Sequence, residues 1–166
     1  SEEEKVERLN VLAHWESPGN GSYYDDIGNP AKSPHVLHSE FTFTQPGEEA
    51  NPEPTLWWWD NGLSRERLSF QSSMGWPEAV VYEGLDPEAK YIVRTTGYGQ
   101  ALLKIDGESV KPILDETEIG AFKEFPVSAE SLRDHAITLT WDRPTNEGHL
   151  NWRQHSRVSE VWLIKQ

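Results

Sequence analysis

The sequence predicts an all-β fold, a two-sheet antiparallel β-sandwich of the jelly-roll type with nine or ten short strands and little helix. Apolar and polar residues alternate in short runs along most of the chain, and this period of two is typical of strands with one face in water. Gly, Pro, Asn and Asp separate the runs, as turns between antiparallel strands require. The length of 166 residues suits one domain over residues 1–166, which we expect to belong to a larger multidomain protein.

The expected strands follow from the alternation, taken in chain order. In the run AITLTWD, for example, Ile137, Leu139 and Trp141 alternate with small or polar residues. In VLHSEFTFTQ, Leu37 and Phe41 are separated by an even number of positions, so both are expected on the face of the strand that points to the core. The expected strands are residues 11–15, 36–45, 67–71, 80–82, 91–96, 101–106, 108–113, 121–127, 136–142 and 157–164.

Two local signals refine the connections. Asp106 and Gly107 stand between two of these runs, and an Asp-Gly pair is a strong signal for a two-residue hairpin. Ser128 precedes ESLRDH and is a suitable N-cap for one capped turn over residues 128–135. Two stretches, residues 17–35 and 45–55, read as long loops, a length that favours a functional role or disorder.

Composition excludes several classes of protein. The chain carries 28 acidic and 15 basic residues, a net charge of −13, which disfavours nucleic acid and anionic membrane surfaces as partners. Its apolar runs are too short to span a bilayer. There is no cysteine, so neither disulfides nor thiolate metal sites exist. The chain contains eight tryptophans and a single methionine, so its unusual feature is a large amount of rigid aromatic surface.

The second half of the chain resembles a known family. YEGLDPEAKYIVRTTGYGQALLKIDG, residues 82–107, is similar to the middle of galactose-binding-domain-like jelly rolls, and FPVSAESLRDHAITLTWDRP followed by NWRQHSRVSEVWLIK is similar to their closing strands. Such domains commonly serve as non-catalytic carbohydrate-binding modules of bacterial polysaccharide-degrading enzymes, often with a structural calcium ion. The resemblance implies a module that is secreted, periplasmic or on the cell surface.

Aromatic residues beside polar ones suggest where a sugar would bind. A pyranose ring stacks its C–H face on an aromatic ring while polar side chains hydrogen-bond its hydroxyl groups. In LWWWDNG a strand would turn Trp58 away from Trp57 and Trp59, whereas Trp141 and Trp162 share their parity with apolar partners and are expected in the core. The residues we predict to contact ligand are Trp58, Asn61, Trp76, Tyr23, Tyr24, Trp152, Arg153 and His155.

One loop contains several side chains with oxygen atoms that could bind a metal ion. Calcium prefers several oxygen ligands, and Asp25, Asp26 and Asn29 in YYDDIGN are the candidates; the alternative is a surface loop with an Asx turn. A zinc site at His35, His38 and Glu40 is disfavoured because His35 does not share a strand face with the other two.

The predicted function is non-catalytic binding of a polysaccharide or oligosaccharide, which targets an attached polysaccharide-degrading enzyme to its glycan. The first alternative is a structural module that packs against neighbouring domains through outward tryptophans. A less favoured alternative is a small jelly-roll lyase or hydrolase. Glu160, on an otherwise apolar strand, is expected to form a structural ion pair with Arg94 or Arg157 rather than to act in catalysis.

Overall fold

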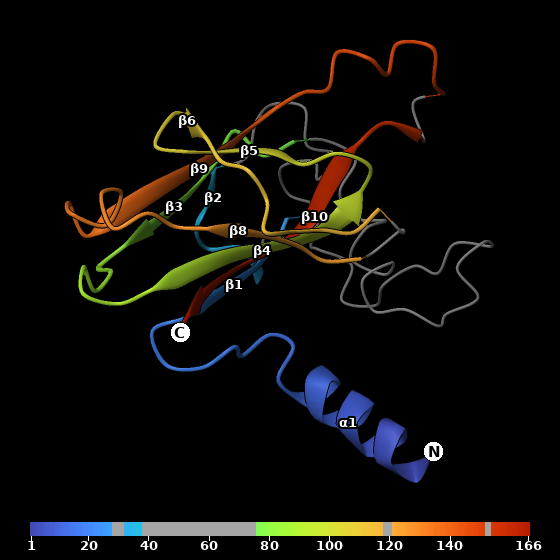
Figure 1. Cartoon of the computed structure of the whole chain (residues 1–166), viewed down its shortest axis with the longest axis vertical. Coiled ribbons are helices and arrows are strands. Elements are labelled where there is room, and N and C mark those ends of the chain that lie inside the picture. Colours follow the sequence, from blue (N-terminus) through green and yellow to red (C-terminus); the bar gives the residue numbers. More distant parts are fainter. Residues whose placement is uncertain (28–31, 38–75, 118–120, 152–153) are drawn as a thin grey trace.

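The structure is a computed structural model that describes residues 1–27, 32–37, 76–117, 121–151 and 154–166. Over these residues it contains two antiparallel sheets of five strands each, which confirms the predicted two-sheet β-sandwich. Sheet A has the order β1-β10-β4-β8-β7 and sheet B the order β2-β3-β9-β5-β6, and sheet B lies above sheet A in Figure 1. No helix in the described part of the chain is long and apolar enough to cross a membrane.

The strands of each sheet come from both halves of the chain. Those of sheet A are β1 (Tyr23–Asp26), β10 (Arg157–Lys165), β4 (Tyr91–Tyr98), β8 (Lys123–Pro126) and β7 (Leu114–Asp115). Those of sheet B are β2 (Val36–Leu37), β3 (Ala79–Glu83), β9 (Ala136–Asp142), β5 (Leu102–Ile105) and β6 (Glu108–Ser109). Every pairing is antiparallel, as expected for strands joined by turns and loops.

The core lies between the two sheets and follows the predicted alternation. In β4, Val93 is buried while Ile92 and Arg94 on either side of it are only half-buried. In β9, Ile137, Leu139 and Trp141 all face the core. The apolar inward residues of both sheets therefore form one cluster, which supplies the main driving force for folding.

The two-residue hairpin predicted at Asp106 and Gly107 is present. These residues connect β5 to β6 with φ angles of 52° and 85°, and a turn with two positive φ angles is the one whose twist matches the flanking strands. The capped turn near residue 128 also forms, because Ser131 N donates to Ser128 Oγ at 3.1 Å.

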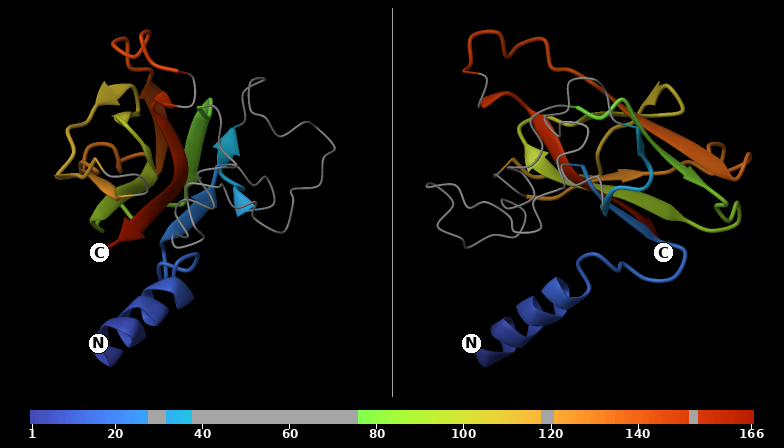
Figure 2. Two further views of the ribbon diagram at one scale, coloured as in Figure 1. Left: turned by 90° about the vertical axis from the view of Figure 1, so that its right-hand side faces the viewer. Right: turned by 180° about the vertical axis from the view of Figure 1, so that it is seen from behind.

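The N-terminal prediction is wrong, because residues 11–15 are not a strand. Helix α1 (Glu2–Ala13) covers most of them, and it begins with a capping box in which the Ser1 side chain accepts from the Glu4 backbone N–H. Three glutamates in the first turn favour this helix through its dipole. The helix has no buried residue and projects away from the sandwich in both views of Figure 2.

The parity expected for Leu37 is also wrong. Val36 is 8% exposed, whereas Leu37 is 51% exposed, so the inward positions of β2 are shifted by one residue. The residues that carried this part of the prediction beyond Leu37 lie outside the described residues.

A β-bulge in β10 changes which residues face the core. The pairing of β10 with β4 shifts register between Val158 and Glu160, so Val158 joins Val161 and Leu163 in the core, whereas Glu160 and Trp162 alternate with Val161 and face the other side of sheet A. Trp162 is buried, as predicted, but on the outer face.

Trp15 covers this outer face. Its ring packs edge-on against Trp162 at a centroid distance of 5.2 Å, and its carbonyl accepts a hydrogen bond from Trp162 Nε1 at 2.8 Å. Trp15, which follows α1, thus covers the outer face of sheet A at Glu160 and Trp162, the residues that the bulge turns to that face.

Candidate functional site: the Lys123 cleft

A cleft of about 480 Å³ lies at the edge of the sandwich formed by β5 and β6 of sheet B and β7 and β8 of sheet A. We call it the Lys123 cleft. Its lining combines hydrogen-bonding side chains with aliphatic ones. The lining residues are Gly99, Gln100, Ala101, Leu102, Leu103, Ser109, Val110, Lys111, Pro112, Asp115, Thr117, Lys123 and Asp142.

Lys123 forms part of the cleft wall because of its place in sheet A. It pairs with Thr95 of β4 on one side and with Asp115 of β7 on the other. Lys123 and the core residue Phe125 are two positions apart on β8 and therefore lie on the same face of the sheet. The Lys123 side chain thus points between the sheets and is only 8% exposed. Its ammonium group bonds to the Asp115 carboxylate and donates to the Glu116 carbonyl at 2.7 Å, which offsets the cost of burying the charge.

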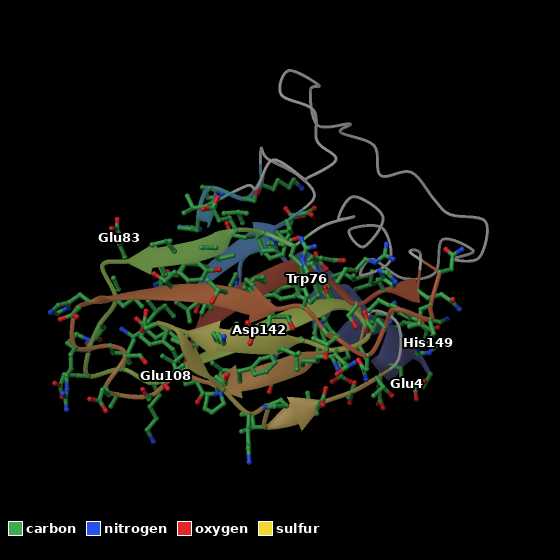
Figure 3. All side chains as sticks on the ribbon, turned by 90° about the horizontal axis from the view of Figure 1, so that it is seen from above. Glu4, Trp76, Glu83, Glu108, Asp142 and His149 are labelled. Carbon is green, nitrogen blue, oxygen red and sulfur yellow. The ribbon has the colours of Figure 1, made fainter. Side chains whose placement is uncertain are left out.

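A second ion pair lies at the other side of the cleft. Lys104 Nζ on β5 donates to Asp142 Oδ1, at the end of β9, at 2.9 Å, and Asp142 is labelled in Figure 3. The lining contains two lysines, Lys111 and Lys123, and two aspartates, Asp115 and Asp142. Its formal charge therefore balances, which suits a neutral polar ligand better than an ion.

The loop between β4 and β5 is fixed at the rim of the cleft by Ser156. Gln100 N donates to Ser156 Oγ at 2.7 Å, and Ser156 N donates to Glu147 at 2.8 Å. Gly99 has a φ of +72°, and a Cβ atom there would overlap Ser156, so the approach of the two segments requires glycine. Gln100 also donates through Nε2 to Asn146 Oδ1 at 3.0 Å, so Asn146 and Ser156 both lie next to a residue of the cleft rim.

A small side pocket adjoins the Lys123 cleft. Its volume is about 10 Å³, and it shares Gly99, Gln100, Ala101 and Lys123 with the cleft. Thr95 and Tyr98 of β4 also line it. Thr95 is 1% exposed, and its Oγ1 is buried with no hydrogen-bond partner among the described residues. One of the residues that line the pocket therefore carries a buried hydroxyl group without a hydrogen-bond partner among the described residues.

Comparisons with known proteins add no candidate for the ligand. No family model, curated protein or solved structure matches the chain. The resemblance to galactose-binding-like modules therefore stays a prediction.

Of the predicted ligand-contacting residues, those that are described do not gather in one place. Trp76 is half-buried and packs against the core cluster. His155 is exposed and precedes Ser156, which anchors the cleft rim. Trp58, Asn61, Trp152 and Arg153 lie outside the described residues, as does Asn29, the third of the predicted calcium ligands.

Tyr23 and Tyr24, both half-buried, point to opposite sides of sheet A. The Tyr23 ring packs against His35 at a centroid distance of 5.1 Å, whereas Tyr24 Oη donates to Glu160 at 2.5 Å on the outer face. The two rings therefore do not form one binding platform.

Asp25 closes the edge of the sandwich opposite the Lys123 cleft. Its carboxylate is fully buried and accepts from Tyr82 Oη at 2.8 Å and from the His35 backbone N–H at 3.1 Å. The His35 ring Nδ1 lies 3.0 Å from the same carboxylate. Burial, together with the negative charge of Asp25, raises the pKa of Tyr82 well above its ordinary value.

This arrangement bears on the predicted calcium ligands. Asp25 pairs with Val161 and points into the sandwich, whereas Asp26 pairs with Glu160 on the outer face, so the two carboxylates do not converge. Among the described residues no group of three or more His, Asp or Glu side chains is placed to hold a metal. The described part of the loop does not fit a calcium site, and calcium stays a prediction that also involves Asn29.

Glu160 is held mainly as a structural acceptor on the outer face. It accepts from Trp15 Nε1 at 2.8 Å and from Thr96 Oγ1 at 3.1 Å, besides Tyr24. Arg94, one of its two expected partners, bonds instead to Glu124 at 2.7 Å. The other candidate, Arg157, has a pKa lowered by burial.

The Lys123 cleft is absent from the sequence-based prediction, although one signal for it exists. In AFKEFPV the lysine has the same parity as Phe125, so a charged side chain occupies an inward position. An inward lysine needs a partner or an opening in the core, and the structure supplies both.

Proposed function

We propose that this chain binds carbohydrate without catalysing a reaction, and that the glycan occupies the Lys123 cleft. The single observation that carries the proposal is the lining of that cleft, in which hydroxyl, amide and paired charged groups alternate with aliphatic side chains. A sugar has the same composition, a rim of hydroxyl groups around an apolar C–H face. The chain would then direct an attached polysaccharide-degrading enzyme, outside the cytoplasm of a bacterium, to its substrate.

Size and charge support the same ligand class. A volume of about 480 Å³ falls within the range of small-molecule sites and suits one or two sugar residues. The ion-paired carboxylates of Asp115 and Asp142 are acceptors for sugar hydroxyls, and Gln100 supplies both a donor and an acceptor. The balanced charge favours a neutral glycan.

Affinity gel electrophoresis and isothermal titration calorimetry with plant, algal and microbial polysaccharides test the proposal. Gln100→Ala and Asp142→Asn should each weaken binding about tenfold, because a lost hydrogen bond to a polar ligand is worth roughly 1 to 2 kcal/mol. Glu130→Gln is the matched control, since Glu130 lies in an exposed ion pair with Arg133 and does not line the cleft. Absence of binding to every glycan, or equal loss in the control, contradicts the proposal.

A second candidate function, a module that packs against a neighbouring domain of a longer chain, is favoured by helix α1. Val6, Leu9, Val11 and Leu12 are exposed apolar residues of this helix, which has no buried residue, and an apolar surface of this kind gains free energy when a partner covers it. If this function holds, Leu9→Glu lowers the melting temperature of the full-length parent protein while leaving that of the isolated chain and its glycan affinity unchanged.

A further inference from the structure

We infer that the side pocket of the Lys123 cleft accepts one free hydroxyl group of a neutral sugar, held between Thr95 and Lys123. The inference rests on the proposed function and specifies its ligand: a sugar residue whose hydroxyl at one ring position carries no further substituent. The cleft would bind the sugar ring, and the side pocket would accept the hydroxyl group at that single ring position.

The first step is the unsatisfied hydroxyl of Thr95. Almost all buried polar groups in folded proteins have hydrogen-bond partners, so an exception calls for an explanation. Thr95 Oγ1 is buried and has no partner in the described part of the chain, although its side chain lines a pocket. A hydroxyl group both donates and accepts, so it can serve either role toward a ligand hydroxyl.

The second step is the ammonium group of Lys123. Thr95 and Lys123 are directly paired across β4 and β8 and both line the side pocket. An ammonium group has three N–H donors, and the described contacts of Lys123 Nζ, to Asp115 and to the Glu116 carbonyl, use two of them. The third donor is available to the same ligand oxygen that Thr95 would contact.

The third step is the size of the pocket. A volume of about 10 Å³ corresponds to a single water-sized group. A hydroxyl oxygen fits such a space, whereas the same oxygen carrying a second sugar or an acyl group does not. The pocket therefore selects for an unsubstituted position and, in the free protein, provides a site for one water molecule that the sugar hydroxyl would displace.

The fourth step is charge, which favours a hydroxyl over a carboxylate oxygen. Asp115 already neutralises Lys123, so an anionic sugar would bring a second negative charge to a compensated lysine. A neutral hydroxyl accepts from the spare N–H and donates to Thr95 without that cost.

Thr95→Val and Thr95→Ser test the inference together. Val has nearly the shape of Thr and lacks the hydroxyl, so it should weaken glycan binding about tenfold. The melting temperature should stay unchanged or rise, because the lost group has no partner among the described residues. Ser keeps the hydroxyl and should retain binding. Ser159→Ala is the matched control: within the described part of the chain Ser159 Oγ is also buried without a partner, but Ser159 is not among the residues that line the cleft or the side pocket.

The ligand probes are the methyl glycosides of glucose, galactose, mannose and xylose, followed by the monodeoxy forms of the one that binds best. Amide shifts of Gln100 and Thr117 in NMR spectra report whether a probe occupies the cleft, and titration gives its affinity. We expect one monodeoxy sugar to bind the unmodified chain more weakly than its parent sugar, by the same factor as Thr95→Val weakens binding of the parent sugar. Ser159→Ala should bind the parent sugar with unchanged affinity.

The outcomes separate this inference from the proposed function. If a glycan shifts the cleft residues but Thr95→Val binds it as tightly as the unmodified chain, the inference is wrong and the proposed function stands. If Thr95→Val lowers the melting temperature as it lowers affinity, the hydroxyl is structural and the inference is again wrong. If no glycan shifts the cleft residues, both are wrong.

Discussion

The two lateral edges of the sandwich differ in how completely their buried polar groups are hydrogen-bonded. At one edge Asp25, fully buried, is bonded by Tyr82 and by the His35 backbone, so its polar groups satisfy one another and close the gap between the sheets. At the other edge Lys123 and Thr95 retain hydrogen-bonding capacity beside a cleft. Buried polar residues therefore indicate a ligand only where their hydrogen bonds are incomplete. Where the hydrogen bonds are complete, the residues have a structural role.

Asp25→Ala should have the largest effect on stability. The substitution removes the carboxylate that accepts from Tyr82 Oη and from the His35 backbone N–H, so both donors lose this acceptor inside the sandwich. We expect a loss of about 3 kcal/mol in the free energy of unfolding, measured by urea denaturation. A loss below about 1 kcal/mol would mean that the edge is not held by this carboxylate.

Tyr82→Phe should have a smaller effect that depends on pH. Losing a hydrogen bond to a charged acceptor costs about 2 kcal/mol. Burial and Asp25 raise the pKa of Tyr82, so the phenol stays protonated in the fold at a pH where it would ionise in the unfolded chain. This contribution is complete below about pH 10 and is lost as the pH rises toward the folded pKa.

Urea denaturation at neutral and alkaline pH measures this difference. The unmodified chain should lose stability above about pH 10, and Tyr82→Phe should lack the part of that loss that Tyr82 causes. Parallel curves for the two proteins at all pH values would show that Tyr82 does not contribute to the alkaline transition.

Asp142→Asn at the open edge should alter stability little. The Lys104–Asp142 pair is partly exposed, with side chains 30% and 55% accessible, and such pairs contribute less than about 1 kcal/mol. The same variant is expected to weaken glycan binding, so the ratio of binding loss to stability loss should be high here and low for Asp25→Ala. Equal ratios at the two edges, from calorimetry and denaturation, would remove the distinction between them.

The smallest effect is expected at neither edge, for Asp86→Asn. The hydrogen bond from Lys165 lowers the pKa of Asp86 and raises that of Lys165, so the pair stabilises the fold above about pH 4 and the contribution fades as the pH falls through the folded pKa of Asp86. Asp86→Asn should melt slightly below the unmodified chain at neutral pH and at the same temperature in strong acid. A difference that persists in acid would point to a lost backbone contact, since Glu88 N also donates to Asp86.

The sheets could be predicted from the sequence where alternation is regular. Ile137, Leu139 and Trp141 face the core as expected because β9 is an uninterrupted strand with one solvated face. The N-terminal helix does not follow from the apolar pattern, because a short apolar run suits strand and helix equally; its start depends on the capping box of Ser1 and Glu4.

Other features depend on contacts between distant residues. The bulge at Ser159 adds one residue to β10 and changes the phase of the alternation without any signal in the composition. Regular alternation would place Glu160 and Val158 on the same face of the strand, whereas the bulge places them on opposite faces. The Lys123 cleft depends on β4, β7 and β8 lying side by side, and no local pattern encodes that neighbourhood.

The pairing of β2 with β3 has a consequence for how this chain tolerates change. Leu37 and Ala79 are register partners, and Glu78 N donates to the Leu37 carbonyl at 2.9 Å, so the polypeptide departs from sheet B and rejoins it at adjacent points. Because lengthening a connection whose ends already meet adds little closure entropy, the sandwich should accept a longer connection between Leu37 and Trp76 with little loss of stability. Pro77 is buried and Trp76 packs against the core, so the tolerated change ends before these two residues.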